Sequence, residues 1–132
     1  MTLAEFIAGL SALSVTGVKR KHTEPPPTIS PGDMPLMYPR IPESGGGSGT
    51  FSYASRLRTM AVELVIVVQS VKLGSNAVNM ATTITLMDNL HTALLANAAA
   101  LCIDSWSMSN QADQVSADSY HWLIVARVEA ST

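Results

Sequence analysis

The segment RKHTEPPPTISPGDMPLMYPRIPESGGGSG, residues 20–49, contains all seven prolines of the chain and five of its eight glycines. Proline fixes φ and has no backbone N–H, so this segment can form neither a helix interior nor a central β-strand. Within it, MPLMYPRIP spaces Pro35, Pro39 and Pro42 so that an extended strand is possible only at a sheet edge. The tract SGGGSGT has almost no preferred conformation. We predict that residues 24–55 form an extended Pro/Gly-rich arm or hairpin that serves mainly in contacts outside the subunit's own core.

Two segments have the periodicity of helices. Thr2 and Glu5 form a capping box ahead of apolar residues at helical spacing, so we predict an amphipathic helix over residues 2–13. A longer helix is predicted from an N-cap at Ser75 to about Leu101. We expect the apolar face of this second helix to hold Ala77, Met80, Ile84, Met87, Leu90, Leu94, Leu95 and Ala98.

The remaining segments predict β-strands. VKRKHT is a short extended segment, and MAVELVIVVQ has β-branched residues on both faces, which is typical of a central strand buried on both sides. If that strand begins as early as Arg56, its Arg56 and Arg58 end projects beyond the sheet. CIDSWSMS and SYHWLIVARVEA predict an antiparallel hairpin. The order α-β-β-β-α-β-β indicates an α+β fold, with a mostly antiparallel sheet of about four to five strands packed by two helices in a single domain, 1–132.

Composition restricts the class of protein. Charged residues make up 14% of the chain against a usual value of about 25%, which suggests that other chains cover part of its surface. The net charge of -2 argues against general affinity for nucleic acid. The single cysteine, Cys102, excludes an internal disulfide and fits a reducing cytoplasm. The acidic start does not resemble a secretory leader, and the apolar run LVIVV is too short to cross a bilayer, so we expect no membrane association.

The residues that support catalysis in other proteins are scattered here. His22 and His121 lie on predicted strands with no Asp, Glu or Cys at ligand-like spacing, and no window of the sequence supplies the three or four clustered ligands that a zinc site needs. His91 could be a buried base or ligand. We expect His91 to be a core-edge histidine with one hydrogen bond and Cys102 to be a buried, unreactive thiol. SGGGSGT lacks the Lys-Ser/Thr ending of a phosphate-binding loop and is followed by a strand. We predict no active site, metal or cofactor, and therefore not an enzyme.

Charged residues suggest contacts with other molecules. Arg56 and Arg58 share one face of the long strand and either pair across a subunit boundary with acidic residues or remain solvated. The run KRKH, Lys19 to His22, is either a solvated strand face or a contact to phosphate or to an acidic partner. The residues that we predict at a subunit or tube interface are Asp33, Tyr38, Arg40, Glu43, Arg56 and Arg58.

Four stretches that together span almost the whole chain carry a family resemblance. They are LAEFIAGLSALSVTGVKRKHTEPP, GDMPLMYPRIPE, VELVIVVQSV with the later TLMDNL, and the closing WLIVARVEAST. In these stretches the sequence resembles the tail terminator proteins of long-tailed, non-contractile (siphovirus-type) bacteriophages. The resemblance implies a structural virion protein whose homo-hexameric ring caps the head-proximal end of the tail tube, stops tube polymerisation and joins the tube to the head connector.

The same resemblance implies partners and a location. The expected partners are further copies of the chain, the major tail tube protein and the head-tail connector protein, with DNA only passing through the channel. Lys19, Arg20 and Lys21 are candidates to face that channel. The expected location is the tail-neck junction of the virion, and the host cytoplasm during assembly.

Two alternative functions follow from the same residues. The first is another neck component, such as a head-completion or tail-completion protein. The second is a small ligand-binding or regulatory domain that uses the sheet edge from Met34 to Arg40.

Overall fold

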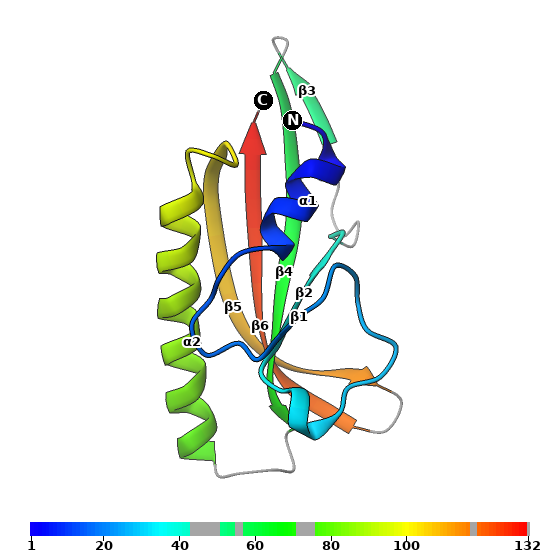
Figure 1. The fold of residues 1–132 in the computed structure, drawn as a ribbon, viewed down its shortest axis with the longest axis vertical. Coiled ribbons are helices and arrows are strands. Elements are labelled where there is room, and N and C mark those ends of the chain that lie inside the picture. The colour runs from blue at the N-terminus through cyan, green and yellow to red at the C-terminus, as the bar shows by residue number, and fades with distance from the viewer. Residues whose placement is uncertain (43–50, 55–56, 71–75, 117–118, 132) are drawn as a thin grey trace.

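A computed structural model describes residues 1–42, 51–54, 57–70, 76–116 and 119–131 (Figure 1). The elements in chain order are α1 (Leu3–Ser11), β1 (Arg20–Lys21), the 3₁₀ turn η1 (Pro31–Asp33), β2 (Leu36–Arg40), β3 (Phe51–Ala54), β4 (Leu57–Ser70), α2 (Asn76–Asn97), β5 (Ile103–Ser116) and β6 (Ser119–Ser131). The predicted α+β class and the order α-β-β-β-α-β-β are confirmed, with the short β3 as an additional strand before β4.

One twisted sheet holds all the strands, in the order β1-β2-β4-β6-β5, and β3 also pairs with β4. Every pairing is antiparallel except that of β1 with β2. Because Arg40 lies opposite Glu63 and Phe51 opposite Met60, β2 and β3 follow one another along the same edge of β4. The tract SGGGSGT lies between these two strands in the sequence, outside the described residues. The turn between β3 and β4 is a different segment.

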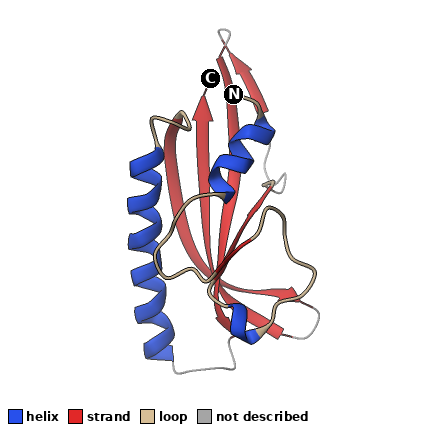
Figure 2. Ribbon diagram, in the orientation of Figure 1, coloured by secondary structure: helices blue, strands red, loops and turns tan. Residues whose placement is uncertain are grey.

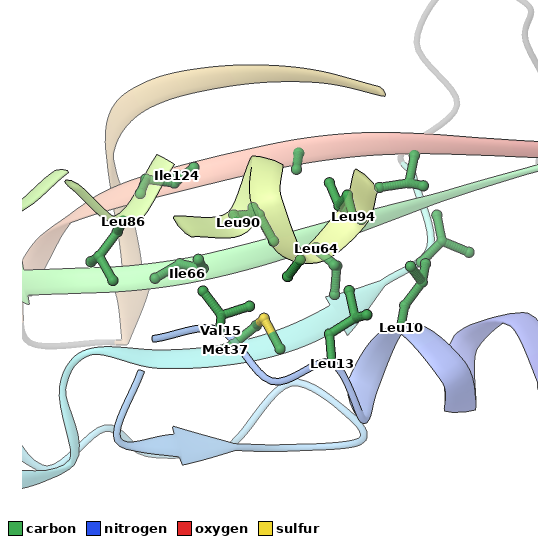
Figure 3. Packing of buried hydrophobic residues seen from close by; sticks show 14 of the residues in the cluster. Leu10, Leu13, Val15, Met37, Leu64, Ile66, Leu86, Leu90, Leu94 and Ile124 are labelled. Atoms are coloured by element: carbon green, nitrogen blue, oxygen red, sulfur yellow. The ribbon is translucent and has the colours of Figure 1, made fainter. Parts of the chain in front are cut away.

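The main hydrophobic core lies between both helices and one face of the sheet. Figure 3 shows Leu10, Leu90 and Leu94 converging on the central strand β4. The predicted capping box holds the start of α1: the Thr2 N–H donates to Glu5 Oε2 at 2.7 Å, and the Glu5 N–H donates to Thr2 Oγ1 at 3.1 Å. This side of β4 contributes Met60, Val62, Leu64, Ile66 and Val68 to the core, as its alternation predicted.

The opposite face of the sheet has its own smaller core, and the proline-rich segment covers it. Met34 is buried there with Leu36, Val65 and Leu123, and Ile29 packs against them. Figure 2 shows this segment leaving β1 as a loop and returning through η1 to β2. The expectation that residues 24–55 lie mainly outside the subunit's own core is therefore wrong for residues 34–39. The reason is that β4 is apolar on both faces, so the second face needs a cover.

The predicted apolar face of α2 is also wrong in part. Leu90 and Leu94 are buried as expected, but the helix turns Asn79 and Thr83 toward the sheet and leaves Met80, Ile84 and Leu95 exposed. The Thr83 hydroxyl donates to the Asn79 carbonyl oxygen at 2.7 Å, which satisfies it inside the protein. Burial of this threonine therefore costs little.

Candidate functional site

The predicted interface residues of the arm have partners within the subunit. Tyr38 is only 4% exposed and belongs to the second core, so its side chain is not a surface contact. Arg40 Nε lies 2.9 Å from Glu63 Oε1, directly across the β2–β4 register. Asp33 Oδ1 lies 3.3 Å from Arg20 Nε on the surface of the same subunit. The predicted pairing of Arg56 and Arg58 with Asp33 or Glu43 of a neighbouring subunit stays a prediction.

The other predicted interface residues lie at or beyond the described part of the chain. Glu43 and Arg56 are outside the described residues, as is the side chain of Arg58. The backbone of Arg58 belongs to β4 and lies opposite Tyr53 of β3. The register with β6 begins only at Thr59, so β4 extends past β6 at this end and its only described partner there is β3. The strand therefore extends beyond β6, but Arg58 lies within the sheet rather than beyond it, and the Arg56 part of the prediction lies outside the described residues.

One end of the sheet is a short basic strand. The main chain around β1 is held by two hydrogen bonds of 2.8 Å, from Lys19 N–H to the Pro35 oxygen and from His22 N–H to the Met37 oxygen. The side chains of Lys19, Arg20 and Lys21 are exposed. Within the described residues β1 pairs with β2 alone, so its outer side is open.

Pro39 is the one proline within β2, and it lies on the side of this strand that faces away from β4. The carbonyl groups of Pro35 and Met37 point toward β1, so Pro39, two residues further on, also faces away from β4. Its missing N–H therefore removes no bond to β4, which confirms the prediction that the strand tolerates proline only at an edge. Beyond the end of β1, a groove of about 420 Å³ is lined by Ile7, Thr23, Glu24, Pro25, Pro39, Arg40 and Ile41.

The opposite end of the sheet is β5, which within the described residues pairs with β6 alone. Helix α2 runs alongside it. Trp106 Nε1 of β5 donates to His91 Nδ1 of α2 at 3.2 Å, and the two ring centroids are 5.4 Å apart. Further along, Met80 and Asn110 line one pocket of about 310 Å³. His91 makes its one expected hydrogen bond, but it is exposed and not within the core.

The sequence analysis did not predict that an apolar stripe on α2 is exposed. Met80, Ile84 and Leu95 recur at helical spacing and are exposed on the same side of the helix as His91, toward β5. The signal was present, because apolar residues occur around more of this helix than one packed face requires. A helix that is apolar over most of its circumference is typically covered on more than one side.

The described residues contain no candidate metal centre. Among them there is no group of three or more His, Cys, Asp or Glu side chains that could hold a metal ion. Cys102 is exposed, contrary to our prediction, because it occupies the turn between α2 and β5 with a φ of 55°. This left-handed residue lies at the end of the turn that follows α2, directly before β5 begins at Ile103. None of the described helices is long and apolar enough to cross a membrane.

Comparisons with known proteins do not assign this chain to a family. No protein-family model matches the chain, and no curated protein matches it.

Proposed function

We propose that the protein is a structural subunit of a phage tail, a tail terminator whose ring caps the head-proximal end of the tail tube. The observation that carries this proposal is the presence of two open sheet edges at opposite ends of one sheet, formed by β1 with β2 and by β5. When different surfaces of identical subunits meet head to tail, the assembly closes into a ring if the rotation per step divides the circle. The resemblance in sequence supplies the identity of that ring.

The hairpin of β3 and β4 is the proposed contact with the tube. Figure 1 shows it extending past the end of β6. At its end the backbone of Leu57 and Arg58 pairs with β3 and not with β6. A contact of this kind needs no catalytic group, because termination requires only that one face of the ring bind the last tube ring and the other face not do so.

The mass in solution and the capping of tubes test this function. Six copies of a 14.0 kDa chain give a ring of about 84 kDa, which light scattering after size-exclusion chromatography should detect over a range of protein concentrations. The protein should then be added to tubes polymerised from the tube protein of the same phage. We expect rings at one end of each tube and shorter tubes. Binding to the head connector without binding to tubes would contradict the terminator and favour another neck component.

Deletion of residues 44–48 should separate assembly from folding. The last residue of β2, Arg40, and the first residue of β3, Phe51, flank this tract. Their partners on β4 are three residues apart, roughly 10 Å along the strand. The five residues left between Arg40 and Phe51 reach up to about 17 Å, so both strands can still pair with β4. We expect a thermal midpoint within about 3 °C of the parent and impaired attachment to tubes. A large loss of thermal stability would show that the tract supports the subunit itself.

The groove at the end of β2 favours one second candidate, a domain that binds a peptide at its sheet edge. The groove is largely apolar and lies beside the unpaired side of β2, where an extended peptide could add a strand. A protein that stayed monomeric, left tubes uncapped and bound apolar peptides at Ile41 would support this alternative.

A further inference from the structure

The two end strands of the sheet differ in charge. The side chains of Lys19–Lys21 are exposed along β1, which with the adjoining side of β2 we call the basic edge. Between Lys72 and Arg127 the sequence has four aspartates and no lysine or arginine, and this stretch contains α2 and β5. Asp88 of α2 and Asp104 of β5 are exposed there. The exposed side of α2 together with β5 is therefore an acidic edge, at the opposite end of the sheet.

Each edge also carries apolar surface. On the acidic edge, the stripe of Met80, Ile84 and Leu95 runs along α2 beside β5. On the basic edge, the groove contains Ile7 and the exposed Ile41. Apolar contacts surrounded by complementary charges are the usual composition of a specific protein interface.

We propose that the basic edge of one copy binds the acidic edge of a second copy, head to tail. This inference rests on the ring of the proposed function and names the surfaces that form it. Lys19 and Lys21 then face Asp88 and Asp104 of the neighbouring copy, and the apolar stripe on α2 is covered. The three basic residues thereby gain a role at the subunit boundary in place of the channel-facing role that the resemblance suggested.

The strand directions and the charges both favour this arrangement over a two-fold dimer. β2 is antiparallel to β4, β4 to β6, and β6 to β5, so β1 and β2 run opposite to β5. A neighbour related by rotation about an axis along the strands therefore presents its basic edge antiparallel to β5. Two basic edges repel each other, and so do two acidic edges, which opposes isologous pairing. Lysine on an edge strand likewise discourages pairing with unrelated edges.

Two charge-reversed variants test the contact. The first is Lys19→Glu with Lys21→Glu, which leaves Arg20 to its ion pair with Asp33. The second is Asp88→Lys with Asp104→Lys, although the latter change also removes the hydrogen bond that Ser131 Oγ donates to Asp104 Oδ2. Because all four side chains are exposed, both variants should keep the parent's circular dichroism and thermal midpoint to within a few degrees.

Light scattering at low salt measures the mass of each variant as a function of protein concentration. Each variant alone should need at least about tenfold more protein to assemble than the parent, because it presents like charges at both edges. An equimolar mixture of the two variants should assemble like the parent, since every contact in an alternating ring is again between opposite charges. The mixture is the matched control, because it contains the same substitutions.

The outcomes separate this inference from the proposed function. Rings of parental mass from either variant alone, or no recovery on mixing, would overturn the charged contact and leave the ring in place. A parent that stays at 14.0 kDa at every concentration would also overturn the self-contact. In that case the terminator survives only if rings still appear at tube ends.

Discussion

Leu94→Ala is expected to lower the free energy of unfolding by about 2–5 kcal/mol, because it leaves a cavity in the main core. The Leu94 side chain is fully buried between α2 and the sheet, near Leu64 and Leu90 (Figure 3). In an intact, close-packed core, the neighbours of a deleted side chain relax only partially. Urea unfolding of the monomer followed by circular dichroism, with the midpoint and slope both fitted, measures the change.

The matched control is Leu95→Ala, one residue further along the same helix. Leu95 is 62% exposed, so the same chemical change should alter the free energy of unfolding by less than about 0.5 kcal/mol. The comparison cancels helix propensity, because both substitutions replace leucine by alanine in α2. Equal costs at the two positions would mean that the helix does not present the face described here. A loss of assembly in Leu95→Ala with unchanged stability would further support the proposed contact.

Local patterns in the sequence predicted those parts of the fold that depend on neighbouring residues. The capping box of Thr2 and Glu5 determined the start of α1, because each side chain satisfies a backbone donor three residues away. Alternation along β4 identified a strand buried on both faces, as its two clusters of core residues confirm.

The orientation of α2 could not be predicted in the same way. Several faces of the helix carry apolar residues, and the choice among them depends on the shape of the sheet. Asn79 and Thr83 are buried, whereas the apolar Met80 and Ile84 are exposed. Periodicity alone did not distinguish the apolar residues that face the sheet from those that are exposed, so the predicted face included Met80, Ile84 and Leu95.

Some of the residues that we predicted at an interface in the proline-rich arm have partners within the subunit, which the sequence pattern did not reveal. Composition predicted that the prolines restrict residues 34–39 to a sheet edge, which holds at Pro39, whereas Leu36 and Met37 pair with both β1 and β4. It did not indicate that the adjacent face of β4 needs a cover. Tyr38 faces Val65 in that second core, and Arg40 meets Glu63. The charge difference between the two edges appears only once the strand order is known, since β1 and β5 are far apart in sequence.

Met34→Ala is expected to cost about 2–5 kcal/mol of unfolding free energy in the monomer, because Met34 belongs to the second core. The side chain is 4% exposed and packs in the cluster with Val65 and Val67. The proline-rich segment presents it without regular secondary structure, and the stiffness of that segment reduces the entropy lost when it covers the sheet. The urea midpoint of the monomer should therefore fall, as it does for a residue of the main core.

Met80→Ala is the matched control, because Met80 is 64% exposed on α2. Its substitution should leave the free energy of unfolding within about 0.5 kcal/mol of the parent's value. If the proline-rich segment served only contacts between subunits, the pattern would reverse at Met34: monomer stability would be unchanged and assembly would weaken. The two methionine variants therefore distinguish a contribution to the stability of the subunit from a contribution to contacts between copies. Met34 holds the segment on its own sheet, whereas Met80 belongs to a face that remains available to a neighbouring copy.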